Sequence, residues 1–229
     1  MWYNKCMTYR KDPLITGQYY HIFSRSIAKY IVFNDQDDYG RFNELINLYR
    51  FIDFNYKYSN FSDLKIEMQE NIINGLNKNN VLVEIVAYCI MPTHIHLLLK
   101  QIVDNGISKY IAKILNSYTR YFNLKHHRKG PLWEGHFNNV LVDSDEQLLH
   151  LTRYIHLNPS SANLVEKPED WAFSSYMEYI KSDVFKGVCN FDNLFNLDPT
   201  QYRKFVNDQK SYQRGLSIIK SISIDNYNG

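Results

Sequence analysis

The chain has 229 residues, enough for one sizeable hydrophobic core or for one domain with an appendage. Hydrophobic residues make up 45% of it and charged residues 22%, as in an ordinary soluble globular protein, and the net charge of +2 is too small to indicate a nucleic-acid partner by itself. The sequence has no uncharged run of about 18 apolar residues, so we expect no membrane partner.

The N-terminal part of the chain is predicted to contain a strand, a helix and a polar insertion. Residues 18–24 read as the first strand, and residues 35–51 as a helix with apolar side chains at helical spacing. Residues 55–80 are rich in Asn and Lys, and we expect an insertion there with one helix around residues 63–73.

The middle of the chain is predicted to form two strands, an amphipathic helix and a further strand. The strand over residues 81–90 is interrupted by Met-Pro-Thr at 91–93 and resumes over residues 94–100. Residues 107–123 form a helix with one apolar stripe, and residues 137–142 form the next strand.

One more helix follows the last predicted strand. Ser144 with Gln147 three residues later has the form of a capping box, which places the start of the helix at Asp145. Pro159 disfavours helical geometry at the residue before it, so we expect the helix to end near this proline.

The order of the elements indicates the fold class. It is βαββαβ with an extra helix at the end, which is typical of an α+β, ferredoxin-like sandwich with an antiparallel sheet. We expect residues 1–180 to form one domain and residues 181–229 a helical tail. The three cysteines are far apart and the first twelve residues lack the apolar core of a signal peptide, so a cytoplasmic protein is expected.

Basic charge gathers between Ile107 and His136, where Glu134 is the one acidic residue. Tyrosines and Trp133 are interleaved with this charge, an arrangement that suits the backbone and bases of single-stranded DNA. The alternative is a solvated helix face beside an ordinary core. The basic residues are Lys109, Lys113, Arg120, Lys125, Arg128 and Lys129.

His94 and His96 lie two residues apart on a predicted strand, so their side chains share one face of it. Ile95, Leu97 and Leu99 form an aliphatic row on the opposite face. Two imidazoles on one face can converge on a metal ion if a third ligand comes from elsewhere. The alternative is a pair of hydrogen-bonded histidines that bind no metal.

Tyr154 and Asn158 are four residues apart on the last predicted helix and therefore project from one face. A phenol and an amide oxygen side by side can offer a nucleophile and a hard oxygen ligand to the same ion. The alternative is a packed tyrosine followed by an asparagine that terminates a helix. Tyr118 and Tyr121 are rival nucleophiles, but Tyr118 lies on an apolar stripe and Tyr121 lacks an amide at the same offset.

Four segments occur in a characteristic order along the chain. They are CIMPTHIHLLLK (89–100), GPLWEGHF (130–137), RYIHLNPSSANLV (153–165) and WAFSS (171–175). Together they resemble the single-tyrosine HUH transposases, and among these the REP-associated tyrosine transposases of bacteria. The resemblance covers roughly residues 19–179.

This resemblance implies roles for four residues. His94 and His96 would be the metal-binding histidine pair, Tyr154 the nucleophile, and Asn158 the residue that completes the site for Mg²⁺ or Mn²⁺. The implied reaction is cleavage and rejoining of single-stranded DNA through a 5′-phosphotyrosine. Two positions depart from the family pattern: His136 stands where an arginine is usual, and Asn158 replaces the glutamine of some relatives.

The resemblance also implies a DNA partner, single-stranded or hairpin-forming, and a place of action at the nucleoid in the cytoplasm. Arg25, just after the first strand, is predicted to contact DNA. Trp133 is predicted either to stack on an unpaired base or to plug the core. Relatives include dimers and monomers, so the sequence leaves open whether this chain forms a homodimer.

Two other classes of function compete with this hypothesis. One is a DNA-binding module that keeps the fold but no longer cuts, although mere binding would need neither the two histidines nor Tyr154 and Asn158. The other is a metallohydrolase with a water nucleophile, which would require a further acidic or histidine ligand that does not stand out near the pair.

Overall fold

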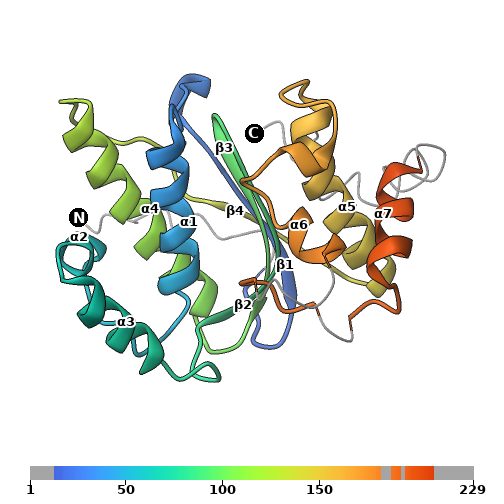
Figure 1. The fold of residues 1–229 in the computed structure, drawn as a ribbon, viewed down its shortest axis with the longest axis horizontal. Coiled ribbons are helices and arrows are strands. Elements are labelled where there is room, and N and C mark those ends of the chain that lie inside the picture. Colours follow the sequence, from blue (N-terminus) through green and yellow to red (C-terminus); the bar gives the residue numbers. More distant parts are fainter. Residues whose placement is uncertain (1–12, 182–186, 192–193, 209–229) are drawn as a thin grey trace, which may run out of the picture.

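The computed structural model describes residues 13–181, 187–191 and 194–208. Within them a four-stranded sheet in the order β2-β3-β1-β4 separates two layers of helices (Figure 1). All three strand pairs are antiparallel, which confirms the predicted ferredoxin-like α+β fold. The strands are β1 (Tyr19–Arg25), β2 (Val83–Met91), β3 (His94–Gln101) and β4 (Asn138–Leu141).

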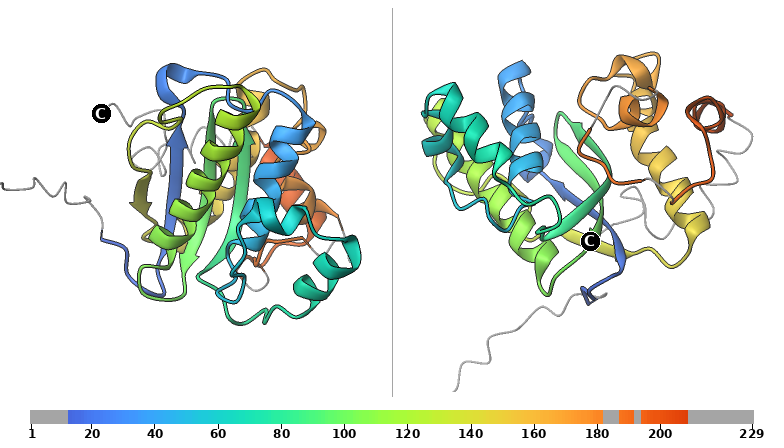
Figure 2. Two further views of the ribbon diagram at one scale, coloured as in Figure 1. Left: turned by 90° about the vertical axis from the view of Figure 1, so that its left-hand side faces the viewer. Right: turned by 60° about the horizontal axis from the view of Figure 1, so that its bottom comes forward.

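The first helical layer packs on one face of the sheet and encloses the larger core. Alternation along β3 turns Ile95, Leu97 and Leu99 into this core, as their pattern predicts. The predicted insertion contributes two short helices to the same side instead of one (Figure 2, right). The helices are α1 (Gln36–Leu48), α2 (Tyr58–Ser62), α3 (Ile66–Asn74) and α4 (Gly106–Lys125).

The second helical layer covers the opposite face of the sheet (Figure 1). Phe23 and Leu98 point from the sheet into a smaller core here, where they meet Leu151 and Ile155. The helices of this layer are α5 (Asp145–Ser161), α6 (Tyr176–Ile180) and α7 (Pro199–Asn207). Single 3₁₀ turns, η1 (Ile27–Lys29) and η2 (Pro168–Asp170), lie in the connecting loops.

Helix α5 runs two residues past Pro159, which lies inside the helix and not at its end. Its start is as predicted, because the side chain of Ser144 accepts a hydrogen bond from the backbone N–H of Gln147. A proline in the last turn costs one hydrogen bond, and Pro159 is buried, so packing maintains the helix for that turn.

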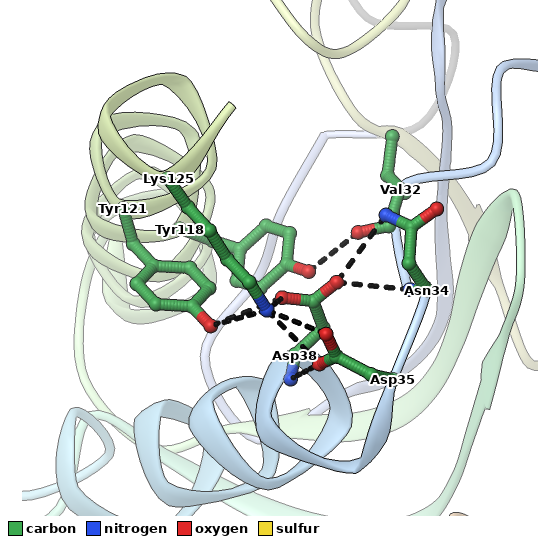
Figure 3. Close-up of polar contacts among 7 residues, drawn as sticks. All are labelled: Val32, Asn34, Asp35, Asp38, Tyr118, Tyr121 and Lys125. Carbon is green, nitrogen blue, oxygen red and sulfur yellow. Dashed lines mark hydrogen bonds and ion pairs between the residues drawn. The ribbon is translucent and has the colours of Figure 1, made fainter. Parts of the chain in front are cut away.

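A partly buried cluster of ion pairs joins α1 and α4 of the first layer (Figure 3). Lys125, at the end of α4, contacts the carboxylate of Asp38 at 2.7 Å and that of Asp35 at 2.8 Å. The Asp38 side chain is completely buried, and it also accepts hydrogen bonds from Asn34 and the Tyr121 hydroxyl. Asp35 caps the N-terminus of α1, so one cluster fixes both helix ends.

Helix α7 comes from the predicted tail and packs on α5 and α6 through Tyr202 and Val206. The division of the chain at residue 180 remains a prediction, and residues 1–12 and 209–229 lie outside the described part of the chain. In that described part, no helix has both the length and the apolar character needed to cross a membrane.

Candidate active site

The strand register brings the histidine pair beside β1. His94 pairs with Arg25, and His96 pairs with Phe23, so these four side chains share the face that α5 covers. His21 lies two residues before Phe23 on the same face. The site is therefore built on the two central strands of the sheet.

His96 lies at the centre of the site and is completely buried. Its Nδ1 is 3.0 Å from Nε2 of His21, and the two rings are stacked. Its Nε2 is buried and has no hydrogen-bond partner. A buried nitrogen without a partner is costly unless a ligand uses it, so Nε2 of His96 is the atom of this site that is best suited to bind a metal ion.

His94 is half-buried beside it, with the two ring centroids 5.0 Å apart. Its Nδ1 lies 2.9 Å from the hydroxyl of Thr93. Burial, and then the positive charge of Arg25, lower the pKa of His94 to about 4. Burial and the neighbouring His94 lower the pKa of His96 in the same direction. Both imidazoles are therefore neutral near pH 7, and neutral imidazole is the form that binds metals.

Tyr154 reaches the same place from α5. Its side chain is 3% exposed, and its ring centroid lies 5.7 Å from that of His96 and 6.1 Å from that of His21. Asn158 follows one turn later, and its Nδ2 donates to the backbone carbonyl of Tyr154 at 2.9 Å. Spacing along the helix placed these two residues on one face, and the packing of α5 on the sheet brings Tyr154 to the histidines.

His21 also belongs to this site, although no motif of the sequence points to it. Its position at even spacing from Arg25 on a strand was the available signal, since such residues share a face. That signal does not say which strand lies alongside. The neighbour of His21 became clear only from the pairing of β1 with β3.

A buried polar cluster joins α5 to α7 and to the start of α6. His156 contacts the hydroxyl of Tyr202 through Nδ1 and that of Ser175 through Nε2, both at 2.8 Å. The Tyr202 hydroxyl also donates to Thr152 at 2.9 Å. Burial lowers the pKa of His156 to about 3, so its ring is neutral. The cluster fixes the rotation of α5 about its axis, and with it the direction of Tyr154.

The predicted DNA-binding residues lie on separate surfaces. Arg25 adjoins the histidine pair, whereas Lys109, Lys113 and Arg120 are exposed on α4, in the other layer. Lys129 is exposed in the loop after α4.

Arg128 and Trp133 serve the structure of this loop and the core. The Arg128 guanidinium donates to the Asn123 side chain and to the Pro131 carbonyl. Trp133 is 6% exposed and packs beside Phe33 and Tyr118. Its placement supports the core-plug alternative and leaves little of its ring for stacking on a base.

The donor set limits what kind of metal site this face can form. Among the described residues there is no group of three or more His, Cys, Asp or Glu side chains that could hold a metal ion. Two histidines would therefore have to be supplemented by other oxygen ligands, such as the Asn158 amide or a phosphate oxygen of the substrate. This set fits a site that is completed when a phosphate binds.

Comparison with known proteins shows which family the middle of the chain resembles. Residues 49–158 match the sequence model described as "Transposase IS200 like". A Haemophilus influenzae protein assigned as a REP-associated tyrosine transposase is 30% identical over 112 residues. Over this region the chain is similar to the IS200-like transposases. The similar region is 44% of this chain and 64% of that protein, so the chain spans less than two thirds of this relative.

The matched region contains the candidate site, and a solved structure shares the fold. The IS200-like match begins before β2 and ends at Asn158, so it contains His94, His96 and Tyr154. A solved structure of a REP-associated tyrosine transposase bound to a REP hairpin covers 83% of this chain and 99% of its own, with a TM-score of 0.53. Its sequence identity is 17%, so this likeness supports the fold.

Proposed function

We propose that this chain is a transposase of the IS200-like type, which cleaves and rejoins single-stranded DNA through a covalent bond to Tyr154 with the help of a divalent metal ion. The approach of Tyr154 to His96, with ring centroids 5.7 Å apart, is the observation that carries the proposal. Tyr154 belongs to α5 and His96 to β3. The packing of α5 on the sheet does not by itself require a phenol beside a buried imidazole.

The chemical step requires only one nucleophile. The phenol oxygen of Tyr154 bonds to the phosphorus of the scissile phosphate, and the bond between phosphorus and the 3′ oxygen breaks. The phenol loses a proton, and the 3′ oxygen gains one and leaves as a hydroxyl. A 5′-phosphotyrosine results, which keeps the energy of the broken bond, so a second 3′-hydroxyl can join to the phosphate without ATP.

His94 and His96 would hold the metal ion, Mg²⁺ or Mn²⁺, and Asn158 would add its amide oxygen. When bound, such an ion polarises a non-bridging oxygen of the phosphate. The unpartnered Nε2 of His96 and the neutral state of both rings fit this role. Arg25, which pairs with His94 across the strands, would balance the charge of the phosphate.

His21 is expected to orient His96 for this task. If His96 binds the ion through Nε2, its Nδ1 carries the proton and donates to Nε2 of His21. His21→Ala removes that acceptor, and we expect Mn²⁺ to bind about 10- to 100-fold more weakly. Isothermal titration calorimetry measures this, with the exposed His126→Ala as a matched control; equal affinities for the two variants would contradict the role of His21.

The DNA partner is proposed from the family and from the structural relative. That relative was solved with a REP hairpin, and we infer that this chain too acts on single-stranded DNA next to a hairpin. Its place of action would be the nucleoid. The covalent step itself uses residues of one chain, and a homodimer is not required by it.

The decisive experiment mixes the purified protein with labelled single-stranded DNA from the flanks of its own gene. With Mn²⁺ we expect a protein–DNA adduct that survives a denaturing gel, and with EDTA no adduct. An adduct of equal yield in EDTA would contradict the metal dependence. Hairpin binding without any adduct, in protein shown by calorimetry to bind Mn²⁺, would instead indicate a DNA-binding module that no longer cuts.

A further inference from the structure

A cavity of about 660 Å³ is lined by residues of α1, of α4 and of the segment 54–59. The helices α1 and α4 lie on the face of the sheet opposite α5 (Figure 1). All but one residue of the segment 54–59 belong to the predicted insertion, and the insertion runs beside α1 and α4 (Figure 2, left). A volume of this size is ordinary for a site that binds a small molecule or one or two nucleotides. The proposed chemistry on α5 makes no use of it.

The cavity is strongly basic. None of the residues that line it is an Asp or a Glu, and Lys125 is neutralised from behind by Asp35 and Asp38. In the described part of the chain, no carboxylate forms an ion pair with the other basic residues of the lining. These residues are Arg41, Lys57, Lys113 and Arg120. Four unpaired cations around one cavity favour an anionic ligand with more than one charge.

Arg41 is held in place by aromatic rings and forms no ion pair, although the charges of Glu44 and Asp63 act on it from a greater distance. Its guanidinium lies over the ring of Tyr58 at 3.9 Å and near the ring of Tyr121 at 5.1 Å. Its Nε is buried and has no hydrogen-bond partner. The neighbouring Glu44 accepts a hydrogen bond from the Tyr58 hydroxyl instead. The two rings therefore fix a planar donor that suits a phosphate and leave its charge unpaired.

An exposed aromatic ring stands at the same cavity. Tyr56 is 44% exposed, and its ring packs by one side against Phe54 and Phe61. Exposed rings beside basic side chains are the combination by which proteins bind unpaired nucleotides. The amide of Asn116, exposed on α4 and also in the lining, can hydrogen-bond to a base edge.

We propose that this cavity binds an unpaired segment of the DNA strand, with phosphates on Arg41, Lys113 and Arg120 and one base against Tyr56. The inference rests on the proposed function in taking DNA as the substrate, but not on the cleavage step. The site lies on the far side of the sheet from Tyr154, so it would anchor the strand away from the cleaved bond.

The test measures binding of a thymidine hexanucleotide by fluorescence anisotropy in EDTA, where no cleavage is expected. Lys113→Gln with Arg120→Gln should weaken binding by roughly tenfold, and should reduce the slope of log affinity against log salt by about 1.4, or about 0.7 per phosphate contact. The matched control is Arg203→Gln with Lys204→Gln, which removes the same charges from exposed positions of α7. This control should bind like wild type.

The Tyr56→Leu variant distinguishes a site that binds nucleotide bases from a site that binds DNA only through its positive charge. Wild type should prefer the thymidine hexanucleotide to an abasic hexamer, and Tyr56→Leu should bind both equally, since the base loses its stacking partner. Unchanged affinity and salt slope in the Lys113/Arg120 variant, or no preference in wild type, would overturn the inference. Displacement by thymidine monophosphate at equal concentration would also overturn it, in favour of a free-nucleotide site.

The proposed function and this inference fail in different experiments. A protein that forms the Tyr154 adduct but shows no effect of the cavity variants keeps its function and loses this site. A protein that forms no adduct but shows the expected losses keeps the site and loses the cleavage reaction.

Discussion

Tyr154→Phe is expected to abolish the protein–DNA adduct, with a fall in its rate of formation of at least about a thousandfold. The change removes one hydroxyl and keeps the ring, which is buried in the core between the sheet and α5, so the fold should persist. No other group on the described part of α5 can form the same phosphate ester beside His96. A denaturing gel with labelled single-stranded DNA and Mn²⁺ measures the result.

Tyr121→Phe is the matched control, because it removes a hydroxyl from the rival tyrosine on α4. That hydroxyl is bound to Asp38 in the other helical layer, and its loss should leave the adduct intact. Circular dichroism should show both variants folded. An adduct that persists in Tyr154→Phe and disappears in Tyr121→Phe would move the nucleophile to α4 and refute the proposed site.

Of the variants proposed here, Asp38→Asn is expected to cause the largest loss of stability. The free energy of unfolding should fall by about 2–4 kcal/mol. The variant keeps the shape of the side chain but removes the buried charge that Lys125 contacts at 2.7 Å (Figure 3). Lys125 retains Asp35 and partial contact with water, which limits the loss. Thermal unfolding should show a midpoint lower by roughly 5–15 °C for a chain of this size.

The control and the pH dependence distinguish a buried charge from a lost hydrogen bond. Asp35→Asn keeps a good helix cap at a half-exposed position and should cost less than about 1 kcal/mol.

Burial would raise the pKa of Asp38, but hydrogen bonds from Lys125, Asn34 and Tyr121 hold it below its ordinary value of 3.8. Its stabilisation is therefore present above that pH and is lost as the pH falls through the lower folded pKa. The difference between wild type and Asp38→Asn should shrink on acidification; a constant difference would contradict the charge-based account.

The sequence alone determined the fold and the main features of the candidate site. Alternation along residues 94–100 separated His94 and His96 from the aliphatic row, and helical spacing put Tyr154 and Asn158 on one face. These are local patterns, set by the period of a strand or a helix, so they can be seen without knowledge of the neighbours. The order of the elements then indicated the antiparallel sandwich.

Only the tertiary structure decided which residues meet across elements. The register of β1 against β3 placed His21 against His96, the packing of the first core buried Trp133, and the insertion closed a basic cavity against α4. It also carried α5 past Pro159, against the local preference of the chain. Each of these contacts forms between segments that are far apart in the sequence. The periodic pattern of one segment shows which of its faces is buried, but not which residues of another segment lie against that face.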